Sequence, residues 1–275
     1  MPLDQPDDIN EAKEMSFFEH VDELRRHIVR SLIAILVAAI ALFINKSFVF
    51  DTVLFGPIKT DFWTYRQFCK LSYLLTNTDE YCVKEMGFVL SNIDITGQFT
   101  QHLFISFVGG LVIAFPFVLW QFWLFIKPAL NTKEIKYARG LVSAGSLLFF
   151  TGVLFGYYIL SPLSVKFLGS YRVSDMVSNE INLQSYVSFI ATIVFATGII
   201  FEMPILVYFL AKIGILGSTI MRKYRRYALI VILILAGLLT PSPDMASQIM
   251  MALPLYGLYE LSIIVAKRVE RNRIS

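Results

Sequence analysis

Long uncharged apolar stretches recur along this chain and constrain its fold more than any other feature. Helices of about 20 residues are needed to cross about 30 Å of hydrocarbon. Four stretches are long enough, at 28–48, 103–126, 141–165 and 186–210. Two shorter ones follow, at 227–240 and 246–266. With 56% hydrophobic and 16% charged residues, the chain carries more apolar surface than a soluble domain can bury. The sequence therefore predicts an all-α integral membrane protein with six transmembrane helices.

The last two stretches are expected to form short helices. The segment 227–240 has 14 residues, which reach about 21 Å as a helix, less than a full crossing. Glu260 shortens the uncharged part of the last stretch to a similar length. We expect two short spans joined by a turn at 241–244, which would thin the bilayer around them. A re-entrant or core helix at 227–240 is the alternative.

The positive charges orient these spans. Seventeen of the 24 Lys and Arg residues fall on one side, in the N-terminus, the loops 127–139 and 211–227, and the C-terminus. Such basic segments stay in the cytoplasm. We therefore expect both termini to be cytoplasmic, with residues 1–27 forming a cytoplasmic amphipathic helix. The chain shows no long linker and no internal repeat, so we expect residues 1–275 to form one membrane domain.

The largest loop between spans, 49–97, falls on the opposite, periplasmic side. Aromatic and aliphatic residues recur there at helical spacing, which predicts an amphipathic helix at the membrane interface. They are Phe62, Tyr65, Phe68, Leu71 and Leu75. The chain's two cysteines, Cys69 and Cys82, also lie in this loop. An oxidising compartment would permit a disulfide between them, and two free thiols are the alternative.

Residues that support catalysis are scarce. The chain has three histidines, without the spacing of a zinc site or a metalloprotease helix. No glycine-rich phosphate loop and no nucleophile elbow occur. The basic residues follow the membrane topology and do not form a nucleic-acid patch. We therefore expect neither an enzyme nor a cofactor, metal ion or nucleic-acid partner.

Glu134 has an unusual electrostatic setting. The two basic loops contain nine Lys and Arg residues, and Glu134 is their only acid. A basic peptide would be repelled everywhere in these loops except near this carboxylate. Alternatively, Asn131 or Thr132 caps a helix and Glu134 stabilises its first turn. Both interpretations stay open from the residues alone.

Glu23 lies on the N-terminal amphipathic helix. Arg26 and His27 follow it by three and four residues, so an exposed ion pair within the helix would explain the carboxylate. The residues alone favour that explanation over a binding role. An exposed pair of this kind contributes only a few tenths of a kcal/mol.

Glu202 interrupts the fourth apolar stretch and is followed by Pro204. A charged carboxylate near the bilayer centre costs at least about 2.5 kcal/mol, so it needs a partner, a polar cavity or a proton. Acids inside a membrane are functional candidates for that reason. A hydrogen bond that clamps a neighbouring span is the structural alternative.

Several motifs in this chain resemble those of TatC, the multi-spanning core subunit of the twin-arginine protein translocase. The segments that carry the resemblance are 20–26 (HVDELRR), 115–125 (FPFVLWQFWLF), 128–130 (PAL) with Glu134, 201–204 (FEMP) and 239–248 (LTPSPDMASQ). Each motif is weak alone, and their order and spacing make the joint signal strong. The outer loop is longer than expected for the family, and the turn reads Thr-Pro-Ser-Pro-Asp where Thr-Pro-Pro-Asp is more familiar.

The resemblance implies a bacterial inner-membrane protein with a concave bundle, which recognises signal peptides with consecutive arginines on folded cargo. It implies that partner helices of the TatA and TatB type join a multimeric complex, and that the proton gradient drives transport. By motif, the expected signal-peptide residues are Glu23, Arg25, Phe125, Leu130 and Glu134. Glu202 and Gln248 are the expected intramembrane polar positions for docking partner helices. A proton-coupled secondary transporter that titrates Glu202 is the alternative function.

Overall fold

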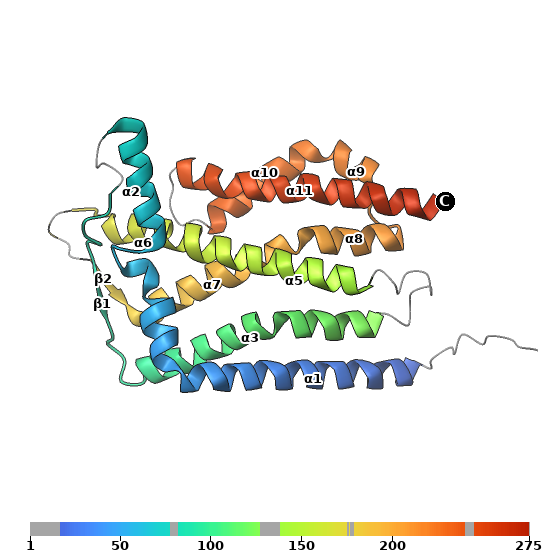
Figure 1. Ribbon diagram of the computed structural model, residues 1–275, viewed down its shortest axis with the longest axis horizontal. Coiled ribbons are helices and arrows are strands. Elements are labelled where there is room, and N and C mark those ends of the chain that lie inside the picture. The colour runs from blue at the N-terminus through green and yellow to red at the C-terminus, as the bar shows by residue number, and fades with distance from the viewer. Residues whose placement is uncertain are drawn as a thin grey trace, which may run out of the picture.

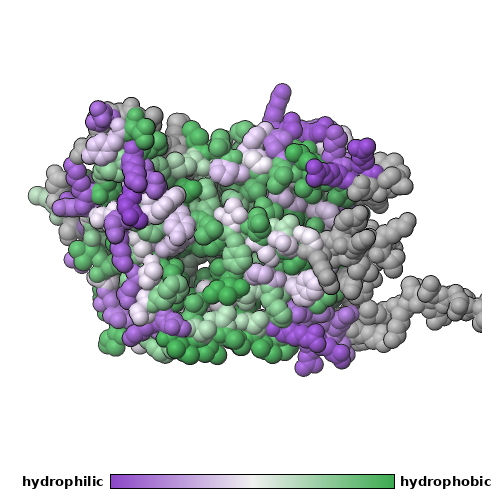
Figure 2. All heavy atoms as spheres, viewed as in Figure 1, coloured by the Kyte–Doolittle hydropathy of each residue, from purple (hydrophilic) through white to green (hydrophobic). Residues whose placement is uncertain are grey.

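The structure is a computed structural model that describes residues 17–77, 82–126, 138–174, 176, 179–239 and 245–274. It is mostly helical, and long helices run along one common direction (Figure 1). Five helical segments are long and apolar enough to cross a membrane: Val21–Ile44, Gly97–Ile126, Gly140–Ser170, Leu183–Ile213 and Gln248–Arg271. In Figure 2, apolar residues cover the middle of the visible face, and hydrophilic residues gather at its two ends. The described chain is thus a multi-span membrane protein.

Most of the helices belong to the bundle. Their bounds are α1 (Phe17–Ile44), α3 (Gly97–Ile126), α5 (Ala138–Phe155), α6 (Ser161–Ser170), α7 (Leu183–Phe201), α8 (Met203–Ile213), α9 (Ser218–Lys223), α10 (Arg225–Leu239) and α11 (Met245–Ile274). We call the end that holds the start of α1, the end of α3, α9 and the end of α11 the basic end. The basic residues of α1, α9 and α11 lie there.

Smaller elements lie across the opposite end, which we call the cap. They are η1 (Phe48–Leu54), η2 (Gly56–Ile58), α2 (Trp63–Thr76), β1 (Val89–Ser91) and β2 (Glu180–Asn182). Helix α2 confirms the predicted amphipathic helix of the large loop. The strands β1 and β2 pair in parallel, with Leu90 opposite Ile181. The all-α expectation is wrong in this detail, because three-residue strands leave too short a pattern to detect.

Helix α1 joins the predicted N-terminal amphipathic helix and the first span in one element of 28 residues. It ends at Ile44, four residues before the predicted end of the span. The Asn45 side chain donates a hydrogen bond to the Ala41 carbonyl at 2.8 Å, and so occupies an acceptor of the last helical turn. Helix α3 begins at Gly97, where the predicted outer loop ends, and is 30 residues long.

The third span contains a helical irregularity that the sequence did not predict. A π-helical turn, η4 (Gly156–Leu160), separates α5 from α6. Pro162 follows this turn and has no N–H, so the carbonyl of Tyr158 loses its helical donor. The Thr64 hydroxyl of α2 donates a hydrogen bond to this carbonyl. A cap helix thus satisfies a backbone group that proline leaves free inside the span.

The fourth span breaks at Glu202, between α7 and α8. Pro204 stands in the first turn of α8, a position where proline is tolerated because that N–H has no helical acceptor. The sequence predicted a charge in this apolar stretch and not a helix break, which the structure adds. Together α7 and α8 still form one candidate span of 31 residues.

The last two helices differ from each other in length. Helix α10 has 15 residues, about 22 Å, and matches the predicted short helix. Helix α11 has 30 residues, so the expectation of a short last helix is wrong. Its acid Glu260 accepts hydrogen bonds from Arg225 at 2.7 Å and Tyr256 at 3.1 Å. These partners compensate the charge, so the helix continues past the point where the sequence suggested an end.

Glycines allow the spans to pack closely. A Cβ added at Gly110 of α3 would lie 2.7 Å from the Ala39 nitrogen of α1. A Cβ at Gly152 of α5 would lie 2.6 Å from the Thr197 carbonyl of α7. Helix α11 packs against α8 and α10, and a buried core lies between α7, α10 and α11. Small residues at such crossings are typical of helix packing in membranes.

Candidate functional site

Glu23 lies on α1 at the basic end of the bundle. Its Oε2 atom is buried and has no hydrogen-bond partner among the described residues. The neighbouring Asp22, Arg25 and Arg26 side chains are exposed. The ion pair within the helix, which the residues alone favoured, is absent from the described part of the chain. Glu23 precedes Ile44 by about 32 Å of helix, which is close to one hydrocarbon thickness.

A buried hydrogen bond lies one helical turn beyond Glu23. His27 Nδ1 and Gln121 Oε1 are 2.6 Å apart, and the bond joins α1 to α3. His27 is 9% exposed and Gln121 is 5% exposed. This pair was not predicted from the sequence, although a glutamine in an apolar stretch is itself a signal for a buried polar contact. The bond fixes the part of α1 that carries Glu23.

Trp123 follows Gln121 on α3 and is also buried. Its ring lies 5.7 Å from that of Phe209 on α8. The indole Nε1 is buried and has no hydrogen-bond partner in the described segments. The basic end therefore contains an acceptor on Glu23 and a donor on Trp123 that are both unpaired.

The other predicted signal-peptide residues are only partly described. Phe125 is half-buried at the last turn of α3, and Arg25 is exposed on α1. Both belong to the same end as Glu23. Leu130 and Glu134 lie outside the described residues, so the proposed pairing of Glu23 with Glu134 stays a prediction.

Glu202 lies at the break between α7 and α8. Both of its carboxylate oxygens are buried, and neither has a hydrogen-bond partner among the residues that the structure describes. A Cβ at Gly145 of α5 would lie 3.2 Å from Oε2, so the missing side chain leaves room for the carboxylate. Eleven residues, about 16 Å of helix, separate Glu202 from Ile213, which places it near mid-membrane. The structural alternative, a hydrogen bond that clamps a neighbouring span, does not reach hydrogen-bond geometry among the described residues.

Gln248 has a local structural partner. Its Nε2 atom donates a hydrogen bond to the Leu233 carbonyl at 3.0 Å and so joins α11 to α10. The Arg225–Glu260 ion pair joins the same two helices near the basic end. Gln248 therefore contributes to the packing of α10 on α11, and its role in docking partner helices stays a prediction.

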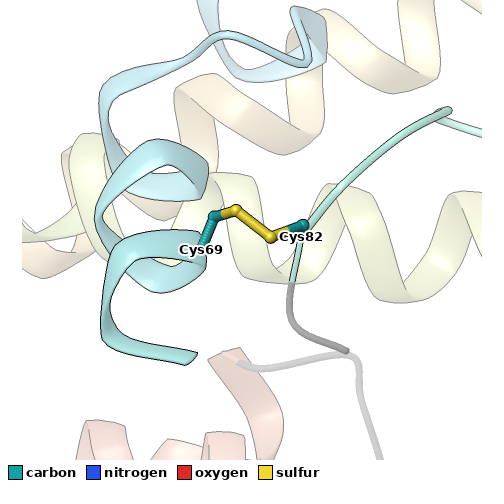
Figure 3. Close-up of a disulfide and its surroundings, with 2 residues drawn as sticks. All are labelled: Cys69 and Cys82. Carbon is teal, nitrogen blue, oxygen red and sulfur yellow. A yellow bond between two sulfur atoms is a disulfide. The ribbon is translucent and has the colours of Figure 1, made fainter. Parts of the chain in front are cut away.

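The two cysteines lie in the cap. A disulfide links Cys69 of α2 to Cys82, with Cα atoms 4.5 Å apart (Figure 3). This bond ties α2 to the segment that leads into β1. Within the described ranges, no group of three or more His, Cys, Asp or Glu residues is placed to hold a metal ion.

These observations define a multi-span helical membrane protein with unpaired buried polar groups at the basic end, near the start of α3 and at one helix break. A family profile described as "Sec-independent protein translocase protein (TatC)" matches residues 19–254. The TatC protein of Blattabacterium sp. subsp. Periplaneta americana is 40% identical over 265 residues, covering 96% of this chain and 99% of that protein. The TatC protein of Carboxydothermus hydrogenoformans is 32% identical over 265 residues, covering 96% and 98%. The chain belongs to the TatC family of protein translocase components.

Solved structures agree with this assignment. A crystal structure described as the twin arginine translocase receptor TatC has a TM-score of 0.66 and 32% identity, and covers 92% of this chain and 100% of that one. A second, of the receptor in the detergent DDM, has a TM-score of 0.67, also at 32% identity, and covers 90% and 99%. The helix arrangement is therefore that of the family.

Proposed function

We propose that this protein is the signal-peptide receptor of a twin-arginine translocase, and that it binds paired arginines of folded cargo at the basic end. Membership of the TatC family and likeness to structures named as receptors support the proposal. The observation that carries the proposal is the unpaired carboxylate oxygen of Glu23. This buried Oε2 atom lacks a partner in the described chain, and an arriving guanidinium would supply one.

Arginine suits this position better than lysine. A guanidinium is always charged and can donate two parallel hydrogen bonds to one carboxylate, whereas an ammonium is a compact point charge. Glu23 is proposed to bind one arginine and Glu134 the other. Phe125 and Leu130 would contact apolar parts of the peptide beside them. Arg25 and the other basic residues would repel cationic segments that lack the correct two contacts.

The proposed orientation follows from the charges. The basic end would face the cytoplasm, with both termini there, in the cytoplasmic membrane of a bacterium. Helix α10 would be the fifth of six spans. At 15 residues it falls short of a full hydrocarbon crossing, so the bilayer would be thinner beside it.

Partner subunits would complete the translocase. Single-span helices of the TatA and TatB type are proposed to dock at the intramembrane positions Glu202 and Gln248, in a multimeric complex. Glu202 supports this role because both of its buried oxygens lack a described partner. The protein would act by binding, and the proton gradient would drive transport.

A peptide titration with two neighbouring acids tests the proposal. Purified protein in nanodiscs is titrated with a twin-arginine signal peptide and its twin-lysine analogue. Glu23→Gln is expected to weaken twin-arginine binding about 30-fold or more, the range for losing one partner of a buried charge pair. Asp22→Asn is the matched control, because Asp22 is the adjacent acid on α1 and is exposed. Equal affinity for the two peptides, or equal losses in the two variants, contradicts the proposal.

The alternative function, a proton-coupled secondary transporter, rests on Glu202. Its buried and unpaired carboxylate is the observation in its favour. Glu202→Gln separates the two functions. Under the receptor proposal this variant binds the twin-arginine peptide with unchanged affinity. Under the transporter alternative, it loses proton-coupled uptake of a small solute into vesicles, while the peptide shows no specific binding to either form.

A further inference from the structure

Helix α2 lies at the cap end of the bundle and runs across the direction of the spanning helices (Figure 1). Its first turn is fixed at a defined depth. The Thr64 hydroxyl bonds to the Tyr158 carbonyl, and the Tyr65 hydroxyl donates to the Pro162 carbonyl at 2.8 Å. Along the third span, these two carbonyls lie about 27 and 33 Å from Gly140. The hydrocarbon core of a bilayer is about 30 Å thick, so α2 lies at the membrane boundary on the cap side.

The two sides of α2 have different surroundings. The side that faces the bundle carries Thr64, Tyr65, Phe68 and Ser72, which are buried or half-buried. The exposed side carries Trp63, Arg66, Gln67, Lys70, Leu71, Tyr73 and Leu74. On this side Trp63 is 51% exposed, Tyr73 53% and Leu74 82%. At 3.6 residues per turn, Leu71 and Leu74 lie toward one flank of the exposed side, Arg66 and Lys70 lie toward the other, and Trp63 lies between them.

The charges on the exposed side have one sign. Helix α2 contains no acidic residue, and neither Arg66 nor Lys70 forms an ion pair with the part of the chain that the structure describes. They follow each other by four residues and therefore lie one above the other on the helix. Aromatic and basic side chains together at the membrane boundary are typical of segments that lie in the headgroup region.

We propose that the exposed side of α2 binds anionic phospholipids in the leaflet on the cap side. Arg66 and Lys70 would contact lipid phosphates, Trp63 and Tyr73 would lie at headgroup level, and Leu71 and Leu74 would reach the first acyl carbons. The charges favour lipid over a second copy of the chain. Two copies that met through this side would bring Arg66 and Lys70 against their equivalents, which is repulsive.

Fluorescence quenching of Trp63 tests the proposal. The full-length protein is placed in nanodiscs of phosphatidylglycerol and phosphatidylcholine, with bromine on the acyl chains of one lipid at a time. Trp120 and Trp123 are common to the parent and to Trp63→Phe, so the difference between these two proteins isolates Trp63. We expect brominated phosphatidylglycerol to quench Trp63 about twofold more than brominated phosphatidylcholine at equal mole fraction, because basic residues concentrate anionic lipid. Bromine near the headgroup end of the chain should quench more than bromine near the terminal methyl.

Charge variants sharpen the outcome. The double variant Arg66→Gln with Lys70→Gln is expected to abolish the preference for phosphatidylglycerol and to keep the quenching itself. Arg172→Gln is the matched control, because Arg172 is an exposed cation beyond the end of α6 and outside α2. Absence of Trp63 quenching, equal quenching by the two lipids, or loss of the preference in the control overturns the proposal. The lipid proposal does not depend on signal-peptide binding, and a peptide titration on the same nanodiscs reports that function separately.

Discussion

The tyrosines of the cap and Glu23 of the basic end differ in how their buried polar atoms are paired. In the cap, tyrosine hydroxyls donate to backbone carbonyls of other elements. The Tyr65 hydroxyl lies 2.9 Å from the Pro57 carbonyl and 2.8 Å from the Pro162 carbonyl and shares its single proton between them, and the Tyr186 hydroxyl donates to the Leu54 carbonyl at 2.7 Å. At the basic end, the Glu23 carboxylate and the Trp123 indole each keep a buried polar atom without a partner in the described chain.

Paired and unpaired buried polar atoms have different energetic consequences. Burial raises the pKa of the Tyr65 phenol, so the hydroxyl stays protonated and remains a donor. Each such bond satisfies a carbonyl that would otherwise cost free energy inside the protein. An unpaired acceptor such as Glu23 costs free energy in the empty protein and is available to a cationic ligand. The tyrosine contacts therefore stabilise the cap, and the unpaired Glu23 oxygen supports the proposed binding role of the basic end.

The largest expected effect on stability concerns the contact of α1, which runs from the basic end to the cap, with α3. Gly110→Ala would place a methyl group 2.8 Å from the Ile35 carbonyl and 2.7 Å from the Ala39 nitrogen, so α1 must move away from α3. We expect a loss of about 3 kcal/mol or more in the free energy of unfolding, because backbone atoms cannot repack around the methyl group. Thermal unfolding in detergent, followed by circular dichroism, measures the loss. Gly257→Ala is the matched control, since no atom lies within 4 Å of its added Cβ. Equal melting temperatures for both variants would show that the close α1–α3 contact at Gly110 does not limit stability.

The second prediction concerns the disulfide of the cap. Cys69 and Cys82 are 13 residues apart, and closing a loop of this length contributes up to about 3 kcal/mol by restricting the unfolded chain. We expect both thiols to resist maleimide before reduction and to react after it. Reduction should speed hydrogen exchange in α2 and leave twin-arginine affinity unchanged. The double variant Cys69→Ser with Cys82→Ser should not respond to reductant. Two reactive thiols in the untreated protein would show that the Cys69–Cys82 disulfide does not form.

Tyr65→Phe tests the hydroxyl contacts of the cap with a smaller change. The variant keeps the ring and leaves the Pro57 and Pro162 carbonyls without this donor. We expect a loss of about 2 kcal/mol in unfolding free energy, within the usual cost of unsatisfied buried polar groups. Tyr73→Phe is the control, because Tyr73 is 53% exposed on the same helix. If the peptide affinity falls together with the stability, the division between the two ends is wrong.

Hydropathy predicted most of the fold, because spanning a bilayer demands long apolar helices with clear ends. Helical spacing located α2, and the charge of Glu202 was visible in its apolar stretch, but the helix break there was not predicted. Hydropathy missed the π-helical turn before Pro162, whose freed carbonyl is satisfied by Thr64, 94 residues away from Tyr158. It also ended the last helix too early, because the compensation of Glu260 by Arg225 depends on how α10 packs on α11.

The sequence predicted the site only in part, because the packing of α1 on α3 decides which polar groups meet. The family motif indicated Glu23, and the helix pattern predicted a partner for it on the same helix. The structure instead leaves its Oε2 atom unpaired in the described residues. The bond between His27 and Gln121 connects positions 94 apart in sequence, so only the packing of α1 on α3 reveals it.

The smallest predicted effect tests whether this bond holds Glu23 in place. His27→Ala and Gln121→Ala are combined in a double-mutant cycle, with twin-arginine affinity and unfolding free energy measured for each protein. Because the two side chains are buried and bond to each other at 2.6 Å, we expect a coupling of about 1 kcal/mol in stability. The peptide affinity of either single variant should fall severalfold, less than for Glu23→Gln, because the carboxylate remains and only its position is loosened. Asp22→Asn, at an exposed position of α1, should change neither the peptide affinity nor the unfolding free energy. Strictly additive losses in stability would show that the His27–Gln121 contact does not act as a unit, and the basic end would then owe its geometry to the packing of α1 against Gly110 alone.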